Sequence, residues 1–322
     1  MRFLIIQTAF IGDVILATAL VEKLGRFFPT SQIDFLLRKG NEGLLANNSH
    51  VNNVWIWNKK DGKYRNLFKL LKPIQKQRYD FVINIQRFAT TGLFSILTGA
   101  KQVIGFKKNP YSIFFNKRVD HHIGNGIHEV ERNLKLIEDI TDTSFEMPKL
   151  YPSTADFNAV EIYKKQPYIT ISPTSVWYTK QLPLEKWEKL MKLIDKNKYK
   201  IYLLGGIGDK EACEKLVNLN SVKNLAGKLT LLQSAALMCD ANMNYVNDSA
   251  PQHLASAMNA PVTSVFCSTV PTFGFGPLSK NSRIVEVDER LRCRPCGLHG
   301  YKACPKGHFL CAHNIEVEKM LF

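Results

Sequence analysis

Residues 6–20 read IQTAFIGDVILATAL, and they decide the fold class because they join an apolar strand to an apolar helix through a short turn. The turn contains one glycine, Gly12, where a dinucleotide-binding fingerprint would have three. Asp13 follows that glycine at the start of the helix. A carboxylate in this place is usually an N-terminal cap. Asp13 is therefore either a cap or a group placed for chemistry above the sheet.

The bulk composition sets the range of functions. The chain has 322 residues with 45% hydrophobic content, which suits two domains better than one. Its formal charge of +15 predicts an acidic partner, namely nucleic acid, an anionic membrane surface or a phosphorylated substrate. We see neither a signal peptide nor a run of about 18–20 apolar residues that could span a membrane. We expect a cytoplasmic protein, peripherally associated with the inner membrane.

Strand-length apolar runs alternate with segments of helical period, which is typical of parallel α/β sheets. The expected strands are RFLIIQ, IDFLLR, NVWIW, DFVINI, KQVIGF, PYITIS, KIYLLGG, VKNLAG, NMNYV and PVTSVFC. The expected helices include residues 13–28, 41–47, 64–76, 91–97, 129–140, 184–194, 210–216, 231–239 and 250–258. We therefore predict two doubly wound, Rossmann-like domains, residues 1–150 and 151–322. Their linker is placed between Thr141 and Gln166, a stretch of weak pattern.

The turn after the first strand supplies the first candidate site, because such sheets bind ligands beyond the carboxyl ends of their strands. Asp13 lies among exposed helix amides, so we expect its carboxylate to stay ionised. An ionised carboxylate in this position suits a general base acting on a hydroxyl. Thr8 and Gly12, on the same turn, are then expected to lie against the acceptor. The alternative, an ordinary cap, remains open at this point.

Two further candidate segments follow strands of the second domain. Thr174 and Ser175, with Lys180 shortly after them, can hold a diphosphate, although a solvated loop would look the same. In NDSAPQHL, helix amides near Ser249 and Ala250 can meet phosphate oxygens, and Asp248 can accept hydrogen bonds from sugar hydroxyls. His253, one turn into that helix, either faces the same site or is a core histidine. Together these segments predict a site for a nucleotide-sugar donor.

Four segments spread along the chain resemble one family. They are GDVILATALVEKL, SPTSVWYTKQLPLEKW, NDSAPQHLASAMNAPV and CPKGHFLCAHNI. The sequence is similar to glycosyltransferase family 9, which includes the heptosyltransferases of lipopolysaccharide core assembly. The resemblance implies a GT-B fold, with two Rossmann-like domains facing across a cleft. It also implies metal-independent, inverting transfer from a nucleotide donor such as ADP-heptose. By motif, Asp13 matches the catalytic base, Lys180 the lysine on donor phosphate, and Asp248 and His253 donor-binding positions.

The resemblance thus implies an enzyme whose first domain binds the acceptor and whose second binds the donor. Asp13 would deprotonate an acceptor hydroxyl, and Lys180 would stabilise the departing nucleoside diphosphate. Two positions depart from the family pattern, since Ala250 stands for a usual glycine and Ala19 for a common proline. The alternative function is a nucleotide-sugar or nucleic-acid binding protein without transfer activity. No nucleic-acid motif supports that partner.

Basic residues of the first domain suggest where an anionic glycolipid acceptor would bind. The expected helix near residues 63–78 carries Lys69 and Lys72 among other cations, and FKKNPYSIFFNKR forms a second basic, aromatic stretch at residues 106–118. Such a face can bind an acidic glycolipid at the inner membrane leaflet. A solvated helix over a core is the ordinary explanation of the same pattern.

Four of the seven cysteines lie close together near the end of the chain. Cys293, Cys296, Cys304 and Cys311 include a Cys-x-x-Cys pair, which permits a structural zinc site. The spacing is short for a zinc ribbon, so free thiols that pack a loop are the alternative. Catalysis itself is expected to need no cofactor.

Overall fold

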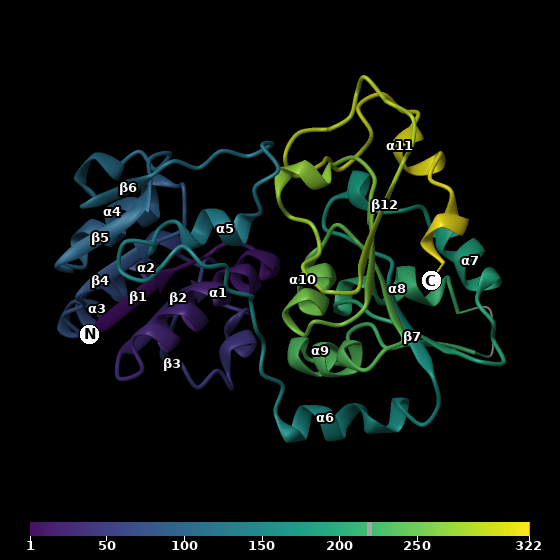
Figure 1. The fold of residues 1–322 in the computed structure, drawn as a ribbon, viewed down its shortest axis with the longest axis horizontal. Helices are drawn as coiled ribbons and strands as arrows, with labels where there is room; N and C mark the ends of the chain where they lie inside the picture. The colour runs from purple at the N-terminus through teal and green to yellow at the C-terminus, as the bar shows by residue number, and fades with distance from the viewer. Residues whose placement is uncertain (218–220, 322) are drawn as a thin grey trace. The chain divides into compact units, whose positions relative to one another are not determined.

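The computed structural model describes residues 1–217 and 221–321 (Figure 1). The chain forms two compact units, which we call unit 1 (Met1–Ile123 and Ile127–Tyr151) and unit 2 (Gly124–Gly126 and Pro152–Phe322). Each unit contains one six-stranded sheet in which the neighbouring strands are parallel. The predicted fold class, two doubly wound α/β units, is confirmed.

The sheet of unit 1 has the strand order β3-β2-β1-β4-β5-β6. Its strands are β1 (Arg2–Ile6), β2 (Gln32–Arg38), β3 (Val51–Trp57), β4 (Phe81–Asn84), β5 (Gln102–Phe106) and β6 (Lys117–Val119). The helices and 3₁₀ turns are α1 (Ile11–Phe27), η1 (Glu42–Leu45), α2 (Lys63–Lys69), α3 (Leu71–Lys76), α4 (Ala89–Leu97), η2 (Ser112–Phe114) and α5 (Glu129–Leu134). In Figure 1 the purple and blue strands of this sheet lie side by side.

Alternate side chains of β1 pack on opposite faces of this sheet, as the period of a strand requires. Leu4 and Ile6 join a buried cluster to which α2, α3 and α4 contribute Leu67, Ile74 and Phe94. On α1, all residues from 14 to 25 are buried, and this helix packs against α5. Because both faces are covered, the central strands are continuous apolar runs.

The sheet of unit 2 has the order β12-β11-β10-β7-β8-β9. Its strands are β7 (Tyr168–Ser172), β8 (Lys200–Leu203), β9 (Val222–Asn224), β10 (Met243–Asn247), β11 (Val262–Phe266) and β12 (Ser282–Glu286). Around it lie α6 (Thr154–Val160), η3 (Glu161–Tyr163), η4 (Tyr178–Lys180), α7 (Leu184–Leu193), η5 (Ile207–Asp209), α8 (Lys210–Glu214), α9 (Leu231–Cys239), α10 (Ala250–Ala257), η6 (Pro271–Phe273), α11 (Leu310–His313) and η7 (Val317–Met320). The final segment, shown in yellow in Figure 1, packs Ala312, Val317 and Met320 into the core around Trp187 of α7.

The two units share one topology, since each sheet places its first and fourth strands side by side at the centre. This is the order of the dinucleotide-binding fold, in which a ligand crevice opens beyond the carboxyl ends of those two strands. In unit 1 the relevant turns follow β1 and β4, and in unit 2 they follow β7 and β10. The topology therefore predicts that the turns carrying Asp13, Lys180 and Asp248 line the ligand crevices of their units.

Several predicted elements were wrong in extent. The edge strands β6 and β12 were not predicted. β6 has only three residues and β12 is largely exposed, so neither has the apolar pattern by which the other strands were recognised. The predicted linker contains α6, which is capped by Ser153 and packs on α9. The single helix expected at residues 64–76 is two helices that meet at Leu70, and α5 ends at Leu134. Among the described residues, no helix is long and apolar enough to cross a membrane.

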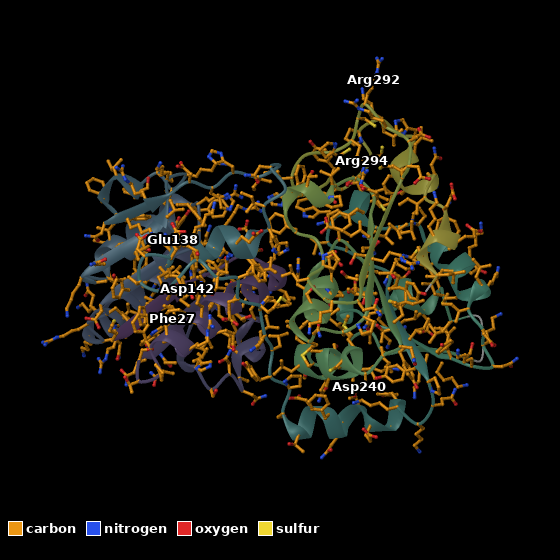
Figure 2. All side chains as sticks on the ribbon, in the orientation of Figure 1. Phe27, Glu138, Asp142, Asp240, Arg292 and Arg294 are labelled. Carbon is orange, nitrogen blue, oxygen red and sulfur yellow. The ribbon has the colours of Figure 1, made fainter. Side chains whose placement is uncertain are left out.

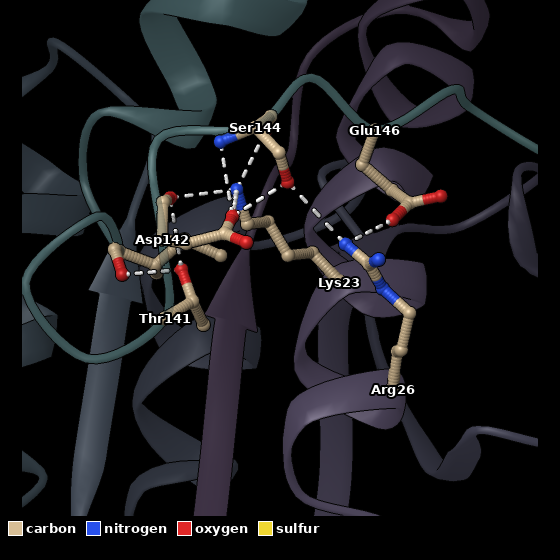
Figure 3. Close-up of polar contacts among 7 residues, drawn as sticks. Lys23, Arg26, Thr141, Asp142, Ser144 and Glu146 are labelled. Atoms are coloured by element: carbon tan, nitrogen blue, oxygen red, sulfur yellow. Dashed lines mark hydrogen bonds and ion pairs between the residues drawn. The ribbon is translucent and has the colours of Figure 1, made fainter.

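A buried lysine attaches the end of unit 1 to α1 (Figure 3). The side chain of Lys23 is fully buried and pairs with the Asp142 carboxylate at 2.6 Å. It also donates to the carbonyl oxygens of Asp142, at 2.7 Å, and of Ser144, at 2.5 Å. One turn further, Arg26 pairs with Glu146 at 3.0 Å. A buried ammonium group needs such partners. These contacts therefore hold residues 142–146 against α1, shortly before unit 1 ends at Tyr151.

Candidate functional site

Asp13 caps α1 from inside its first turn. The backbone N–H of Phe10 donates to Oδ2 of Asp13 at 3.1 Å, so the capping contact considered from the sequence exists. The side chain is only partly exposed, and it lies at the carboxyl edge of the sheet, directly beyond β1. A carboxylate has two oxygens and several lone pairs. Capping by Oδ2 therefore does not prevent Asp13 from accepting a proton.

The environment of Asp13 raises its pKa from 3.8 to about 6. Burial is the largest cause, and the charge of Glu129 is the next. The hydrogen bonds of the helix start and the charge of Arg87 act in the opposite direction. Desolvation is therefore stronger than the effect of the helix amides, which lower the pKa of Asp13 as expected but do not determine the direction of its shift. At pH 7 the carboxylate is still mostly ionised, with a pKa well placed for a general base.

Glu129 is itself held by two neighbours at the start of α5. His121 Nε2 lies 3.1 Å from Glu129 Oε2, and Arg132 Nε donates to the same oxygen at 2.7 Å. Burial alone would raise the pKa of Glu129, but these two partners lower it overall. The Glu129 carboxylate therefore stays charged, and its negative charge makes ionisation of Asp13 less favourable.

Three cations gather beside the turn that carries Thr8, and of these only Lys63 belongs to the basic helix predicted to bind the acceptor. Lys59, just after β3, donates to the Thr8 carbonyl oxygen at 2.6 Å and lies 4.5 Å from the centre of the Trp57 ring. Burial, followed by the charges of Arg38 and Lys63, lowers the pKa of Lys59 to about 8. This cluster, Arg38, Lys59 and Lys63, is called the cation cluster below. Its mutual repulsion would be relieved by a bound anion.

Lys69 and Lys72 lie elsewhere in unit 1. Both are exposed, Lys69 at the end of α2 and Lys72 at the start of α3. Since α2 begins beyond the carboxyl end of β3, its later residues lie progressively farther from that edge of the sheet. Thr8 and Gly12, in contrast, lie on the turn with Asp13. Of the four predicted acceptor residues, only these last two accompany the candidate base.

In unit 2 the predicted donor residues Lys180 and Asp248 contact each other. Lys180 Nζ lies 2.7 Å from Asp248 Oδ2, and both side chains are largely buried. The hydroxyl of Thr269, beyond β11, donates to the same carboxylate oxygen at 2.6 Å. Asp248 therefore holds the ammonium group at the carboxyl edge of the sheet.

Asn247 organises the other turn of the predicted donor site. Its Nδ2 lies 3.4 Å from the carbonyl oxygens of Ser172 and Thr174, and its Oδ1 accepts from Leu182 N at 2.8 Å. Ser175 is fixed through its carbonyl oxygen, which accepts from Gln181 Nε2 at 2.7 Å. Thr174 and Ser175 keep partly exposed side chains. They thus lie on the same edge as Lys180, as predicted.

The first turn of α10 presents the remaining predicted donor residues. Ser249 is the N-cap residue in extended conformation, and no side chain of the described residues caps the helix there. Its first helical residues are Ala250 and Pro251. Because Pro251 has no N–H and Gln252 N donates to the Ser249 carbonyl oxygen at 3.1 Å, the backbone N–H groups of Ser249 and Ala250 are the ones at this end that can bind an anion. His253 is buried on the same helix.

The loop after β12, residues 288–309, contacts the turn that carries Lys180. Thr179 N donates to the Tyr301 carbonyl oxygen at 3.1 Å, and Tyr301 N donates to Thr179 Oγ1 at 2.8 Å. Ser268 joins them, since its hydroxyl donates to Thr179 Oγ1 at 3.0 Å and its carbonyl oxygen accepts from Cys296 N at 2.8 Å. In Figure 2, Arg292 extends outward from this loop. Arg294 donates to the carbonyl oxygens of β11 and its end, Phe266, Cys267 and Thr269.

The four predicted metal-ligating cysteines are all free thiols. Cys311 is buried in the core, where burial raises its thiol pKa to about 12, and burial also raises the pKa of Cys296. Cys293 Sγ lies 3.8 Å from His308 Nε2. Within residues 1–217 and 221–321, no three His, Cys, Asp or Glu side chains are arranged to hold a metal ion. In this arrangement the thiols do not form a complete ligand set.

Comparison with known proteins agrees with the fold and the order of the turns. The model of glycosyltransferase family 9 (heptosyltransferase) matches residues 67–300, and the chain belongs to this family. It is 28% identical to Escherichia coli K12 lipopolysaccharide heptosyltransferase 3, over 81% of each chain. The predicted family and enzyme class, a glycosyltransferase, are confirmed.

Two solved structures show the same fold. E. coli ADP-heptose LPS heptosyltransferase II has a TM-score of 0.78 at 22% identity, over 94% of this chain and 92% of its own. E. coli heptosyltransferase WaaC with ADP has a TM-score of 0.71 at 20% identity, over 88% of this chain and 92% of its own. These similarities confirm the GT-B-like heptosyltransferase fold.

Proposed function

We propose that this protein transfers a heptose-like sugar from a nucleoside diphosphate donor to an anionic glycolipid of the lipopolysaccharide core, with inversion at the anomeric carbon. The observation that carries the proposal is Asp13, a partly buried carboxylate whose pKa is raised to about 6, at the sheet crevice of a glycosyltransferase family 9 chain. ADP-heptose is the proposed donor, because related proteins are named for it.

Unit 2 is the proposed donor-binding unit. Lys180 would bind the diphosphate together with the backbone N–H groups of Ser249 and Ala250 at the start of α10. Asp248, which holds Lys180 at 2.7 Å, keeps the ammonium group in place before the donor arrives. Thr174, Ser175 and His253 line the same edge in this proposal, and the donor sugar hydroxyls would reach Asp248.

Unit 1 is the proposed acceptor-binding unit. The position of the cation cluster changes where we expect the acidic groups of the acceptor to bind. Lys59 contacts Thr8, on the turn with Asp13, whereas Lys69 and Lys72 follow the helices away from that turn. We therefore assign a phosphate or carboxylate of the acceptor to the cation cluster. Lys69 and Lys72 would contribute only at longer range.

The proposed reaction is a single displacement. Asp13 takes the proton of an acceptor hydroxyl, whose oxygen forms a bond to the anomeric carbon. The bond from that carbon to the diphosphate oxygen breaks, and the nucleoside diphosphate leaves with the electron pair. Lys180 and the helix amides stabilise the charge on the leaving group, so this chain needs no metal ion for that step.

Mass analysis of the surface glycolipid tests the proposal in cells. We expect cells without the protein to make glycolipid lacking one heptose and everything attached beyond it. The parent gene should restore the mass, and a gene with Asp13→Asn should not. An unchanged glycolipid in cells without the protein would contradict the proposed function.

A further inference from the structure

Unit 1 presents three large apolar side chains to solvent at one edge of its sheet. Phe88 is 65% exposed, Ile113 is 68% exposed and Phe114 is 62% exposed. Phe88 precedes α4, just beyond β4, whereas Ile113 and Phe114 form η2 between β5 and β6. Single exposed apolar residues are ordinary, but a group of this kind usually marks an interaction surface.

Asn109 joins the two loops that carry these residues. Its side chain is buried, and its Nδ2 donates to the carbonyl oxygens of Gln86 and Phe88, both at 3.0 Å. Its Oδ1 accepts from Tyr111 N at 3.0 Å, and its carbonyl oxygen accepts from Ser112 N at 2.9 Å. The turn that contains Ile113 is thus fixed beside Phe88.

The core side of the same turn explains why the other two residues face outward. Phe115 packs into the buried cluster of unit 1, against the backbone of Gly105. The hydroxyl of Ser112 points inward and donates to the Lys107 carbonyl oxygen at 2.9 Å. With both ends of the turn fixed in this way, Ile113 and Phe114 are held in solvent by the fold itself.

Three cations lie close in the chain to this apolar group. Lys107 and Lys108 are exposed at the start of the η2 loop, and Arg87 directly precedes Phe88. Of these, Lys107 pairs with Asp120 at 2.7 Å. The charge of Arg87 also acts on Asp13, so this surface adjoins the candidate base. Aromatic and aliphatic side chains among cations match the interface of an anionic bilayer, where rings enter the acyl boundary and cations meet phosphates.

We propose that Phe88, Ile113 and Phe114, with Lys107 and Lys108, form a membrane-docking surface that inserts into an anionic lipid bilayer. The inference rests on the proposed function in one respect, since a lipid-borne acceptor explains why docking would occur beside Asp13. The flanking cations favour a bilayer over an apolar protein partner, because they complement lipid phosphates.

Vesicle flotation tests this surface with a matched pair of variants. The test variant is Ile113→Ser with Phe114→Ser. The control is Phe145→Ser with Ile162→Ser, which removes the same two residue types from sites that are 45% and 59% exposed. With vesicles of phosphatidylcholine and phosphatidylglycerol, the parent and the control should float together. The test variant should bind roughly a hundredfold more weakly, at about tenfold per apolar side chain.

The lipid composition and the salt concentration supply further outcomes. Binding of the parent should fall on pure phosphatidylcholine vesicles and as salt rises, because cations contribute to it. Equal flotation of the test and control variants would overturn the proposal. Failure of the parent to bind anionic vesicles would also overturn it and would point to a protein partner for the same surface.

Transfer assays separate this inference from the proposed function. The test variant should transfer sugar to the deacylated, water-soluble carbohydrate of the lipopolysaccharide core at the parent rate, and should be slow only with acceptor in vesicles. If the parent transfers no sugar but the flotation results hold, the proposed function fails and the docking surface stands. Equal loss on soluble and vesicle-borne acceptors would overturn the docking role.

Discussion

Gly300 is the position where a single added methyl group should weaken donor binding. Its backbone is in the left-handed region, with φ of +75°, and it lies against the turn that carries Lys180. A Cβ atom at Gly300 would lie 2.8 Å from Thr179 Oγ1, 3.1 Å from Lys180 Cγ and 3.2 Å from Ser268 Oγ. Because the contact with Thr179 Oγ1 is too close and the other two are tight, Gly300→Ala must shift these groups or its own loop, and we expect the Lys180 turn to be displaced.

The magnitude follows from what Lys180 would lose. A hydrogen bond to a charged group contributes about 1.5–3 kcal/mol. If the displaced ammonium group misses the diphosphate, the dissociation constant for ADP should rise roughly 10- to 100-fold. Gly307 is the matched control, since its φ is +73° but nothing lies within 4 Å of the position of an added Cβ. Alanine in the left-handed region should cost each variant about 1 kcal/mol of folding stability.

Calorimetric titration with ADP, together with thermal unfolding, separates the two effects. Both variants should lose the stability that a left-handed alanine costs, and Gly300→Ala should lose more because of its close contacts, but only Gly300→Ala should bind ADP weakly. If both variants bind ADP as the parent does, the cysteine-containing loop does not position Lys180, and the placement of the donor diphosphate there is refuted.

Three further predictions concern charge and metal. Because the pKa of Asp13 is raised to about 6, its ionised form destabilises the fold, so Asp13→Asn should increase the free energy of unfolding at pH 7 by about 1–3 kcal/mol. That difference should shrink as pH falls from 6 toward 4 in denaturant titrations, and a constant difference would contradict the assigned environment. Lys59→Met should weaken acceptor binding about fivefold, whereas the control Lys72→Met should change it little. Acceptor binding by the parent should also weaken above pH 8, because Lys59 then loses its charge. Equal effects of the two variants would refute the role of the cation cluster in acceptor binding. Chelation by EDTA should leave transfer unchanged, and metal analysis of the purified protein should show less than one zinc per chain. Stoichiometric zinc that disappears in Cys293→Ser would instead support the zinc-site hypothesis.

The sequence was sufficient for the central strands and insufficient for the edges of the sheets. Strands buried on both faces, such as β1, contain apolar runs that the sequence pattern identifies. The edge strands β6 and β12 carry exposed residues and have no such signal. The helix α6 was missed because the weak pattern of residues 141–166 suggested a linker, although Ser153 and Asp156 form a capping box there.

The candidate site was predictable where a residue directly follows a central strand. Asp13, Lys180 and Asp248 were found in this way, but the Lys180–Asp248 ion pair joins distant parts of the chain and needs the fold. The cation cluster was missed for the same reason, since Arg38 and Lys59 follow different strands. The direction of the Asp13 pKa shift could not be predicted, because it depends on burial and on Glu129 of another helix.

The most direct test of the central claim is transfer in a purified system. The protein would be incubated with ADP-heptose and heptose-deficient lipopolysaccharide core, and the acceptor mass and ADP release would be measured for the parent and for Asp13→Asn. We predict that the parent adds one heptose and releases one ADP for each transfer, and that its rate falls as pH drops below about 6. Asp13→Asn should bind ADP as the parent does and transfer no sugar. Parent protein that leaves the acceptor mass unchanged, or an Asp13→Asn variant that transfers at the parent rate, would contradict the account.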